Sequence, residues 1–327
     1  GEKPIYYYHD SNYLLFSSEL SGIENNNLIK FEIDYSSVNL FLRFGYVPAP
    51  KTIYKKVFKL NPGKFLRIKK KNFVEKKIET YFNPQKIFQE NMSSKKNISL
   101  KDASNHLEKL LINSISSQLI ADVPVGALLS GGIDSSLICA LAQESSDLPL
   151  NTFTVGFNEK DFDESKSARK IANHLGTNHQ EIFLKPEEII SHIPKILGHI
   201  DEPFGDSSLI PTFMIMKHAS QNVKVVLSGD GGDELFGGYN RYTQVENIWP
   251  ILKNIPYPLR NLIKLTLQNL PYSLFDKIYS GSIDKVSSKI NKFLSRSLHV
   301  KSLQEFYTSL LGENIKNNLL LSKKNIH

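Results

Sequence analysis

VPVGALLSGGIDSSL, at residues 123–137, joins a short apolar run to a segment of helical character. The apolar run from Val125 to Leu129 is typical of a buried strand. In the loop SGGIDSS, residues 130–136, two glycines leave backbone N–H groups unobstructed and three serines add hydroxyl donors. The start of the next helix adds the positive end of a helix dipole. The stretch therefore predicts a strand–loop–helix junction that cradles an anion the size of pyrophosphate.

An acidic residue, Asp134, lies inside this cradle. A carboxylate among phosphate donors is favourable only when a divalent cation joins them. The loop therefore predicts a nucleotide polyphosphate site with Mg²⁺. It differs from the P-loop that ends in Gly-Lys-Ser/Thr, because no lysine follows the glycines. The competing interpretation is that a Ser or Asp here only caps the helix.

A second acidic glycine loop, SGDGGDE at residues 228–234, favours the functional interpretation. It also follows a short apolar run, Val223 to Leu227, and also opens a helix-like segment. Two such junctions meet at the C-terminal edge of one parallel sheet, where ligands bind. Its carboxylates offer a second magnesium ligand and a group that orients or deprotonates an attacking amine. For Glu234 we prefer a helix N-terminal charge favoured by the dipole.

The chemistry that follows from such a cradle is cleavage of ATP between the α and β phosphates. An acid substrate attacks the α-phosphate and becomes an acyl-adenylate, and a nucleophile such as ammonia then displaces AMP. The strand Thr152–Phe157 offers backbone groups at Val155 that could pair with an adenine edge.

Three further groups of residues are candidates for a function. Residues 206–208, Asp-Ser-Ser, could face a substrate or cap a helix, with equal support. Residues 239–242, Tyr-Asn-Arg-Tyr, could bind phosphate or substrate, or simply pack. His174 and His179 are expected to be exposed or to pack, because no third metal ligand accompanies them.

The bulk composition limits the partners and the compartment. The net charge is +7, but the lysines are scattered, and the densest group, residues 69–71, fits a solvated hairpin turn, so we expect no nucleic-acid binding. No apolar run is long enough to cross a bilayer, so we expect no membrane association. Residues 1–10 have neither a basic nor an apolar signal-peptide region, so we expect no secretory signal. The single cysteine, Cys139, excludes an internal disulfide and fits a buried thiol in the reducing cytoplasm. The oligomeric state is left open, a homodimer included.

The chain divides into two expected domains. Residues 1–92 are expected to be β-rich, and residues 98–327 to be α/β at first and helical beyond about residue 245. Residues 91–98 are polar without periodicity and are expected to be the linker. The expected strands are 5–8, 13–16, 57–60, 64–68, 73–78, 124–129, 152–157, 180–184 and 223–228. The expected helices are 100–119, 134–145, 163–175, 186–199 and 208–220.

These motifs together resemble the glutamine-hydrolysing asparagine synthetase family. The resemblance rests on four stretches: VPVGALLSGGIDSSL (123–137), TFTVGF (152–157), DEPFGDSSLIPT (201–212) and VVLSGDGGDELFGGYNRY (225–242). It implies an α/β fold: a parallel-sheet ATP pyrophosphatase domain, of the adenine nucleotide α-hydrolase-like type. Residues 1–19 and 43–68 look like the end of the family's N-terminal nucleophile glutaminase domain, which would precede it as a β-rich remnant.

The resemblance also implies roles for individual residues. Pyrophosphate would be held by Ser130, Gly131, Gly132, Asp134 and Ser135, and magnesium by Asp134 and Asp233. The adenylate would contact Leu128, Val155, Ser228 and Gly229. Asp230 matches a position that is proposed to assist ammonia attack on the β-aspartyl-AMP intermediate.

The implied activity is that of a carbon–nitrogen ligase of asparagine biosynthesis. ATP, aspartate and glutamine or ammonia would be the substrates, and asparagine, AMP and pyrophosphate the products. The chain looks like an internal fragment that lacks the family's N-terminal Cys nucleophile and its C-terminal segment. Two alternatives stay open: amidation of another carboxylate, such as a sugar acid of surface polysaccharide, and a truncated, non-catalytic nucleotide-binding protein.

Overall fold

The computed structural model describes residues 3–69, 76–93, 98–157, 163–268 and 297–312. The chain divides into two compact units. Unit 1 comprises Gly1–Glu79, Glu202–Gly205 and Phe236–His327, and unit 2 comprises Thr80–Asp201 and Asp206–Leu235. Among the described residues, every helix is too short or too polar to cross a membrane.

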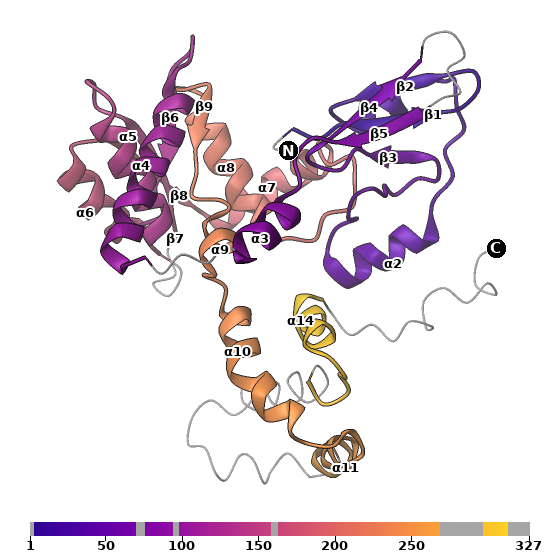
Figure 1. Cartoon of the computed structure of the whole chain (residues 1–327). Coiled ribbons are helices and arrows are strands. Elements are labelled where there is room, and N and C mark those ends of the chain that lie inside the picture. The colour runs from indigo at the N-terminus through magenta and orange to yellow at the C-terminus, as the bar shows by residue number, and fades with distance from the viewer. Residues whose placement is uncertain (1–2, 70–75, 94–97, 158–162, 269–296, 313–327) are drawn as a thin grey trace. The chain divides into compact units, whose positions relative to one another are not determined.

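Unit 2 is built on a four-stranded parallel sheet (Figure 1). Its strands are β6 (Val125–Leu128), β7 (Asn151–Phe157), β8 (Asn178–Leu184) and β9 (Val225–Leu227). Their spatial order is β8-β7-β6-β9, and all three neighbouring pairs are parallel. The chain therefore moves outward from β6 to β8 and then returns to the other side of β6. The expected parallel α/β sheet is confirmed.

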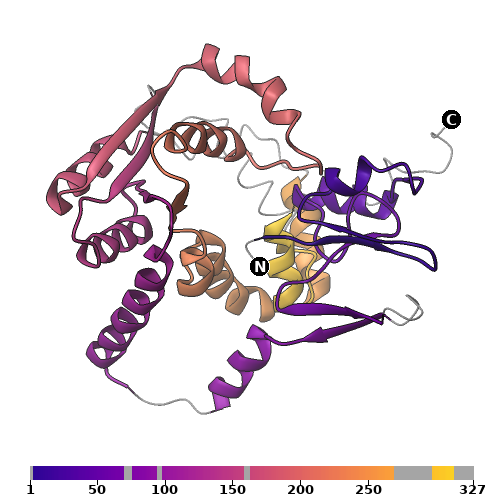
Figure 2. The same cartoon turned by 90° about the horizontal axis from the view of Figure 1, so that it is seen from above.

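Helices cover both faces of this sheet (Figures 1 and 2). One face packs against α4 (Leu100–Leu119), α5 (Ile133–Glu144) and α6 (Ser165–Leu175). The other face packs against α8 (Leu209–Ala219), and α7 (Pro186–Leu197) lies beside α8. The helix boundaries follow local chemistry. The Ser99 hydroxyl caps α4, and Gly176, with φ 71° in the left-handed region, ends α6 directly after the expected helix 163–175.

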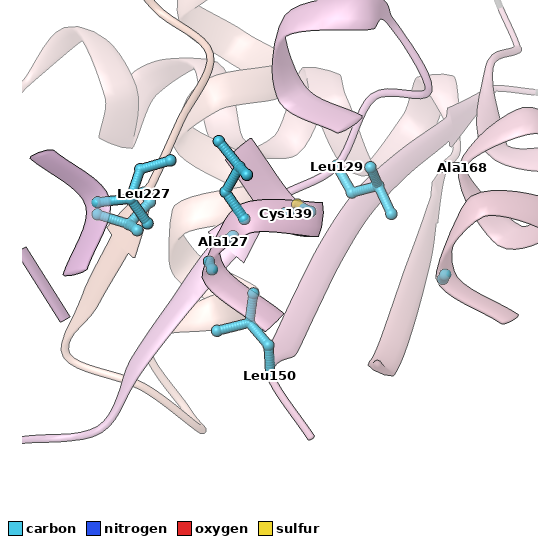
Figure 3. Packing of buried hydrophobic residues seen from close by; sticks show 10 residues of the cluster. Ala127, Leu129, Cys139, Leu150, Ala168 and Leu227 are labelled. Atoms are coloured by element: carbon cyan, nitrogen blue, oxygen red, sulfur yellow. The ribbon is translucent and has the colours of Figure 1, made fainter. Parts of the chain in front are cut away.

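Cys139 lies in the centre of the core on the α5 face (Figure 3). Its side chain is fully buried beside Ala127, Leu129 and Leu150, and its Sγ lies 3.7 Å from the Leu128 carbonyl oxygen. Burial raises the pKa of the Cys139 thiol to about 12. The expected buried thiol is therefore confirmed.

We expect this burial to make Cys139 unreactive in the native protein. The thiolate is the reactive form, and reaction must wait for the core to open. Labelling by a disulfide reagent should be slower than in denaturant by about three orders of magnitude or more, since unfolded fractions are commonly ~10⁻³ or below. A Ser117→Cys variant, which adds a thiol on the exposed side of α4, supplies the control. It should show one fast and one slow thiol, and two fast thiols would contradict the buried position.

The N-terminal part of unit 1 is β-rich, as expected. Its three-stranded antiparallel sheet has the order β2-β1-β3, and β4 pairs with β5 separately. The strands are β1 (Tyr6–His9), β2 (Leu14–Ser17), β3 (Val57–Lys59), β4 (Lys64–Ile68) and β5 (Lys76–Thr80). The first three residues of the expected strand 73–78 lie outside the described residues. The turn at residues 61–63 connects two sheets, because β3 pairs with β1 and not with β4.

Several helices depart from the sequence expectation. The short α1 (Ser21–Glu24) and the longer α2 (Tyr35–Phe44) were not predicted, and α3 (Pro84–Ser93) covers the first three residues of the expected linker. A proline inside a helix lacks a backbone donor and often breaks the helix, but Pro250 lies inside α10. Pro250 lies in the last turn of α10, and apolar residues on both sides of it, such as Trp249 and Leu252, pack in a cluster with Phe306 of α14. This packing holds α10 together at the proline. The remaining helices are α9 (Gly232–Phe236), α10 (Asn240–Lys253), α11 (Tyr257–Gln268) and α14 (Leu303–Leu311).

Candidate active site

The two glycine loops of unit 2 leave the carboxyl ends of neighbouring strands. Val125 to Ala127 of β6 pair in parallel with Val225 to Leu227 of β9, so the chain emerges from both strands at the same edge of the sheet. The strand order reverses between these two strands. Such a reversal opens a crevice beyond the strand ends, and ligands of open α/β sheets bind there.

The loops touch each other through Asp134. A side-chain carbon at Gly229 would lie 3.0 Å from the Ser135 nitrogen and 3.2 Å from the Asp134 Cβ. A side-chain carbon at Gly232 would lie 2.7 Å from the Asp134 carboxyl carbon. The Asp134 carboxylate therefore lies against the second loop, next to the residue that precedes Asp233. Stretches almost a hundred positions apart in the sequence thus form one site.

Internal hydrogen bonds hold the first loop in shape. The buried Ser135 Oγ lies 2.9 Å from the Ser130 Oγ and donates to the Gly132 carbonyl at 3.3 Å. The Ser136 hydroxyl donates to the same carbonyl at 2.6 Å. Ser130 itself is exposed, and Asp134 is half-buried. The Ser130 N–H donates to the Ser135 Oγ at 3.2 Å, and the Gly132 N–H donates to the Ser130 Oγ at 3.3 Å. Ser135 is therefore the buried centre of the hydrogen bonds that shape the loop, while Ser130 and Gly132 lie at its exposed surface.

Gly131 is required by two independent features. Its φ of +84° lies in the left-handed region, which L side chains rarely adopt. A Cβ there would also lie 2.9 Å from the Ser167 Cβ and 3.0 Å from the Ala168 nitrogen, both in α6. The loop therefore packs directly on the first turn of α6, a contact that the sequence pattern did not reveal.

The second loop, residues 228–234, contains a hydrogen bond between two of its own side chains. The Ser228 hydroxyl donates to the Asp230 carboxylate at 2.9 Å. Asp230 is exposed and Asp233 is half-buried at the start of α9. The exposed Asp230 carboxylate is accessible from solvent, and Asp233 directly follows Gly232, the residue that lies against Asp134.

The predicted adenylate contacts share one face of the sheet. Leu128 of β6, Val155 of β7 and Val226 of β9 all pack around the cluster formed by Phe153 and α8. Ser228 and Gly229 follow β9 directly at the same edge. Leu128 and Val155 therefore lie on one face of the sheet, Ser228 and Gly229 lie at its edge, and their contacts with a nucleotide stay a prediction.

Residues 239–242 belong to unit 1 and pack with one another and with α14. The Arg241 guanidinium lies 3.9 Å from the centre of the Tyr239 ring, and Tyr242 stacks on Tyr307 at 5.8 Å. Residues 206–208 form a turn before α8, in which the Asp206 carboxylate accepts the Ser208 N–H at 2.8 Å. Residues 239–242 therefore show the packing alternative, whereas the N-cap residue of α8, Ser208, makes no side-chain capping hydrogen bond.

The residues present fit Mg²⁺ when substrate phosphates complete its ligands. Within the described ranges, no cluster of three or more Asp, Glu, His or Cys side chains forms an all-protein metal cage. Mg²⁺ commonly binds through one or two carboxylates plus substrate phosphates and water. Asp134 and Asp233, on loops in contact, match that donor set.

A buried polar cluster around His179 lies away from this edge and was not anticipated. His179 Nδ1 lies 2.9 Å from the Thr152 Oγ1, and its Nε2 is buried with no hydrogen-bond partner. Nearby, Arg169 and Glu181 form a two-point ion pair. Burial lowers the pKa of His179, with the Arg169 charge adding to the effect and Glu181 opposing it. The packing role expected for His179 is thus observed, but within a polar cluster.

This cluster predicts that the protein loses stability in mild acid. An imidazole whose pKa is depressed by folding binds fewer protons in the native state than in the unfolded chain. The contribution of the neutral His179 to the unfolding free energy is fully present above about pH 6.5, the ordinary imidazole pKa. It is lost as the pH falls from that value toward the lower pKa of the folded protein. The unfolding free energy of a His179→Asn variant, measured by denaturant titration, should depend less on pH between about 6.5 and 5. The exposed His174→Asn variant should keep the wild-type profile, and equal profiles for all three proteins would contradict the assignment.

The parallel sheet, its reversal point and the two acidic glycine loops define an α/β domain of the ATP-pyrophosphatase type. The family model described as asparagine synthase matches residues 106–317, more than half of the chain, and the glutamine amidotransferase domain model matches residues 1–82. The chain belongs to the asparagine synthase family.

Two relatives illustrate the similarity. A putative glutamine-hydrolysing asparagine synthetase 2 of Methanocaldococcus jannaschii is 38% identical over 244 residues, which cover 73% of this chain and 45% of the relative. The glutamine-hydrolysing asparagine synthetase 1 of Bacillus subtilis is 34% identical over 265 residues, which cover 80% of this chain and 40% of the relative. The chain thus spans less than half the length of these relatives. Among solved structures, an NH3-dependent NAD synthetase of Campylobacter jejuni is 14% identical, with a TM-score of 0.31, covering 61% of this chain and 99% of that one.

Proposed function

We propose that the full-length protein is a glutamine-dependent asparagine synthase that converts aspartate to asparagine at the expense of ATP. The observation that carries the proposal is the contact between the two glycine loops at the reversal point of the sheet. Two relatives named as asparagine synthetases support the choice of reaction. A residue range that matches an amidotransferase domain supports glutamine as the nitrogen source. The alternative, another carboxylate amidated by the same chemistry, uses the same loops.

The chain's own residues would perform the first step by binding and orientation. N–H groups of residues 130–132 and the Ser130 hydroxyl bind the β and γ phosphates, which leave as pyrophosphate. Leu128, Val155, Ser228 and Gly229 hold the adenylate, so that the α-phosphorus faces the attacking substrate carboxylate. The products of this step are an acyl-adenylate and pyrophosphate.

Asp230 acts in the second step. Ammonia attacks the acyl carbon, the bond to the AMP oxygen breaks, and one proton must leave the nitrogen. The exposed Asp230 carboxylate, oriented by the Ser228 hydroxyl, accepts that proton or holds the amine in line. Asp134 and Asp233 would hold Mg²⁺, which would supply positive charge to the departing phosphates.

The remaining assignments belong to the same proposal. The enzyme works in the cytoplasm on small molecules, as the single buried thiol and the scattered lysines suggest. Residues 1–92 and 98–327 are proposed as the amidotransferase and synthetase domains. The absence of nucleic-acid and membrane partners and the formation of a homodimer stay predictions.

The test is release of pyrophosphate from ATP by the full-length protein with ammonium and a panel of carboxylates. Aspartate should raise the release rate well above the background with ATP alone, and asparagine should appear in equal amount. Release that depends on a sugar acid and not on aspartate would replace the substrate. No release with any carboxylate would overturn the enzymatic proposal and favour a non-catalytic nucleotide-binding protein.

A further inference from the structure

Residues 202–205 form a short strap that packs as part of unit 1, although Asp201 and Asp206 on either side of it belong to unit 2. The Gly205 N–H donates to the Gly45 carbonyl at 2.7 Å. A side-chain carbon at Gly205 would lie 3.4 Å from the Gly45 Cα. The strap therefore lies close against the turn that ends α2.

An ion pair between Glu202 and Lys59 anchors the strap. The Glu202 carboxylate pairs with the Lys59 ammonium through Oε2 and accepts the Ile53 N–H through Oε1 at 3.1 Å. Lys59 also donates to the Val47 carbonyl at 2.6 Å. The two side chains are only 16% and 12% exposed. Removing one partner of such a pair leaves a charge that is buried and uncompensated.

The strap continues directly into α8. Residues 206–208 separate Gly205 from the first residue of α8, Leu209, and the Asp206 carboxylate fixes them through the Ser208 N–H. Three residues span at most ~3.5 Å each, so a displaced strap leaves little slack before the helix. Ile215 and Ala219 of α8 pack in the cluster that includes Leu128 and Val155, the predicted adenylate contacts.

We propose that Lys59 and Glu202 are positioning residues that form a latch, within unit 1, between the strap and the N-terminal residues of that unit. The latch fixes the start of α8 and, through α8, the face of the sheet that receives the adenylate. ATP binding then depends on a lysine within the residue range that matches the amidotransferase domain. The inference rests on the proposed function, because it names the regulation of the same nucleotide site.

Kinetics of the full-length protein test the latch. In Lys59→Met and Glu202→Gln, the KM for ATP in ammonium-dependent pyrophosphate release should rise at least fivefold, while kcat and the hydrolysis of glutamine without ATP stay within twofold. The matched controls are Lys55→Met and Glu32→Gln, which break an exposed ion pair of the same unit, 53% and 71% exposed. These controls should leave all three values unchanged. An unchanged KM, or a joint fall of every activity as expected from general unfolding, would overturn the proposal.

Amide hydrogen exchange gives a second readout that needs no activity. Exchange in a peptide covering residues 202–208 should be at least tenfold faster in both latch variants than in wild type, and unchanged in the two controls. A wild-type protein without aspartate-dependent activity but with this exchange pattern would refute the proposed substrate and keep the latch. Equal exchange in all five proteins would refute the latch, whatever the substrate.

Discussion

Replacing Asp134 by Asn is expected to reduce pyrophosphate release by the full-length protein at least about a hundredfold, the scale on which a removed electrostatic group acts at a reacting phosphate. The carboxylate lies between the two loops, with its carbon close to Gly232. The amide keeps its shape and removes its negative charge, so the proposed metal loses a ligand where the phosphates bind. The rate is measured at saturating ATP, aspartate and ammonium, with Mg²⁺ present.

An Asp147→Asn variant is the matched control. Asp147 is exposed in the loop that precedes β7, at the amino edge of the sheet. It should retain the wild-type rate, and both variants should keep a thermal midpoint within ~2 °C of wild type, as expected for exposed or half-exposed substitutions. If the Asp134 variant kept a rate within threefold of wild type, Asp134 would have no role at the phosphates.

Replacing Gly131 by Ala is expected to damage both stability and nucleotide binding. A non-glycine residue in the left-handed region costs about 1–2 kcal/mol. The added carbon also meets Ser167 and Ala168 of α6 at 3.0 Å or less, so either the loop or the helix must move. We expect the thermal midpoint to fall by several degrees. The affinity for an ATP analogue, measured by calorimetry, should fall at least tenfold, because the displaced N–H groups no longer converge.

A Gly176→Ala variant is the control that distinguishes the cost of backbone strain from the effect of displacing the loop at residues 130–136. Gly176, at the end of α6, also has a positive φ, 71°, but a side-chain carbon there would have no atom within 4 Å. This variant should lose about 1 kcal/mol of unfolding free energy and keep full nucleotide affinity. If the Gly131 variant behaved in the same way, the loop would tolerate a side chain, and its contact with α6 would have no part in binding.

The parallel sheet and the placement of both loops at its carboxyl edge were predictable because the pattern is local. Each of the two loops follows an apolar run and precedes a helical one, and such junctions have only one edge of a parallel sheet on which to lie. The contact of Asp134 with the second loop follows from that placement. The Cys139 position was also predictable, since its neighbours in sequence are apolar at helical spacing.

The unpredicted features depend on contacts between residues far apart in the sequence. Glu202 accepts a hydrogen bond from a residue 149 positions away, and nothing near Glu202 distinguishes it from a residue of a solvated turn. The His179 cluster joins β7, β8 and α6, so its signal exists only once their register is known. β8 begins two residues before the expected strand, at Asn178, because the polar Asn178 and His179 pair with Asn151 and Thr152 of β7.

The most direct test of the account is a crystal structure of the full-length protein with a non-hydrolysable ATP analogue and Mn²⁺ in place of Mg²⁺. The account predicts an anomalous peak in coordination contact with both Asp134 and Asp233, and the β and γ phosphates against the N–H groups of residues 130–132. A metal bound elsewhere, or a nucleotide whose phosphates lie away from the two loops, would contradict it.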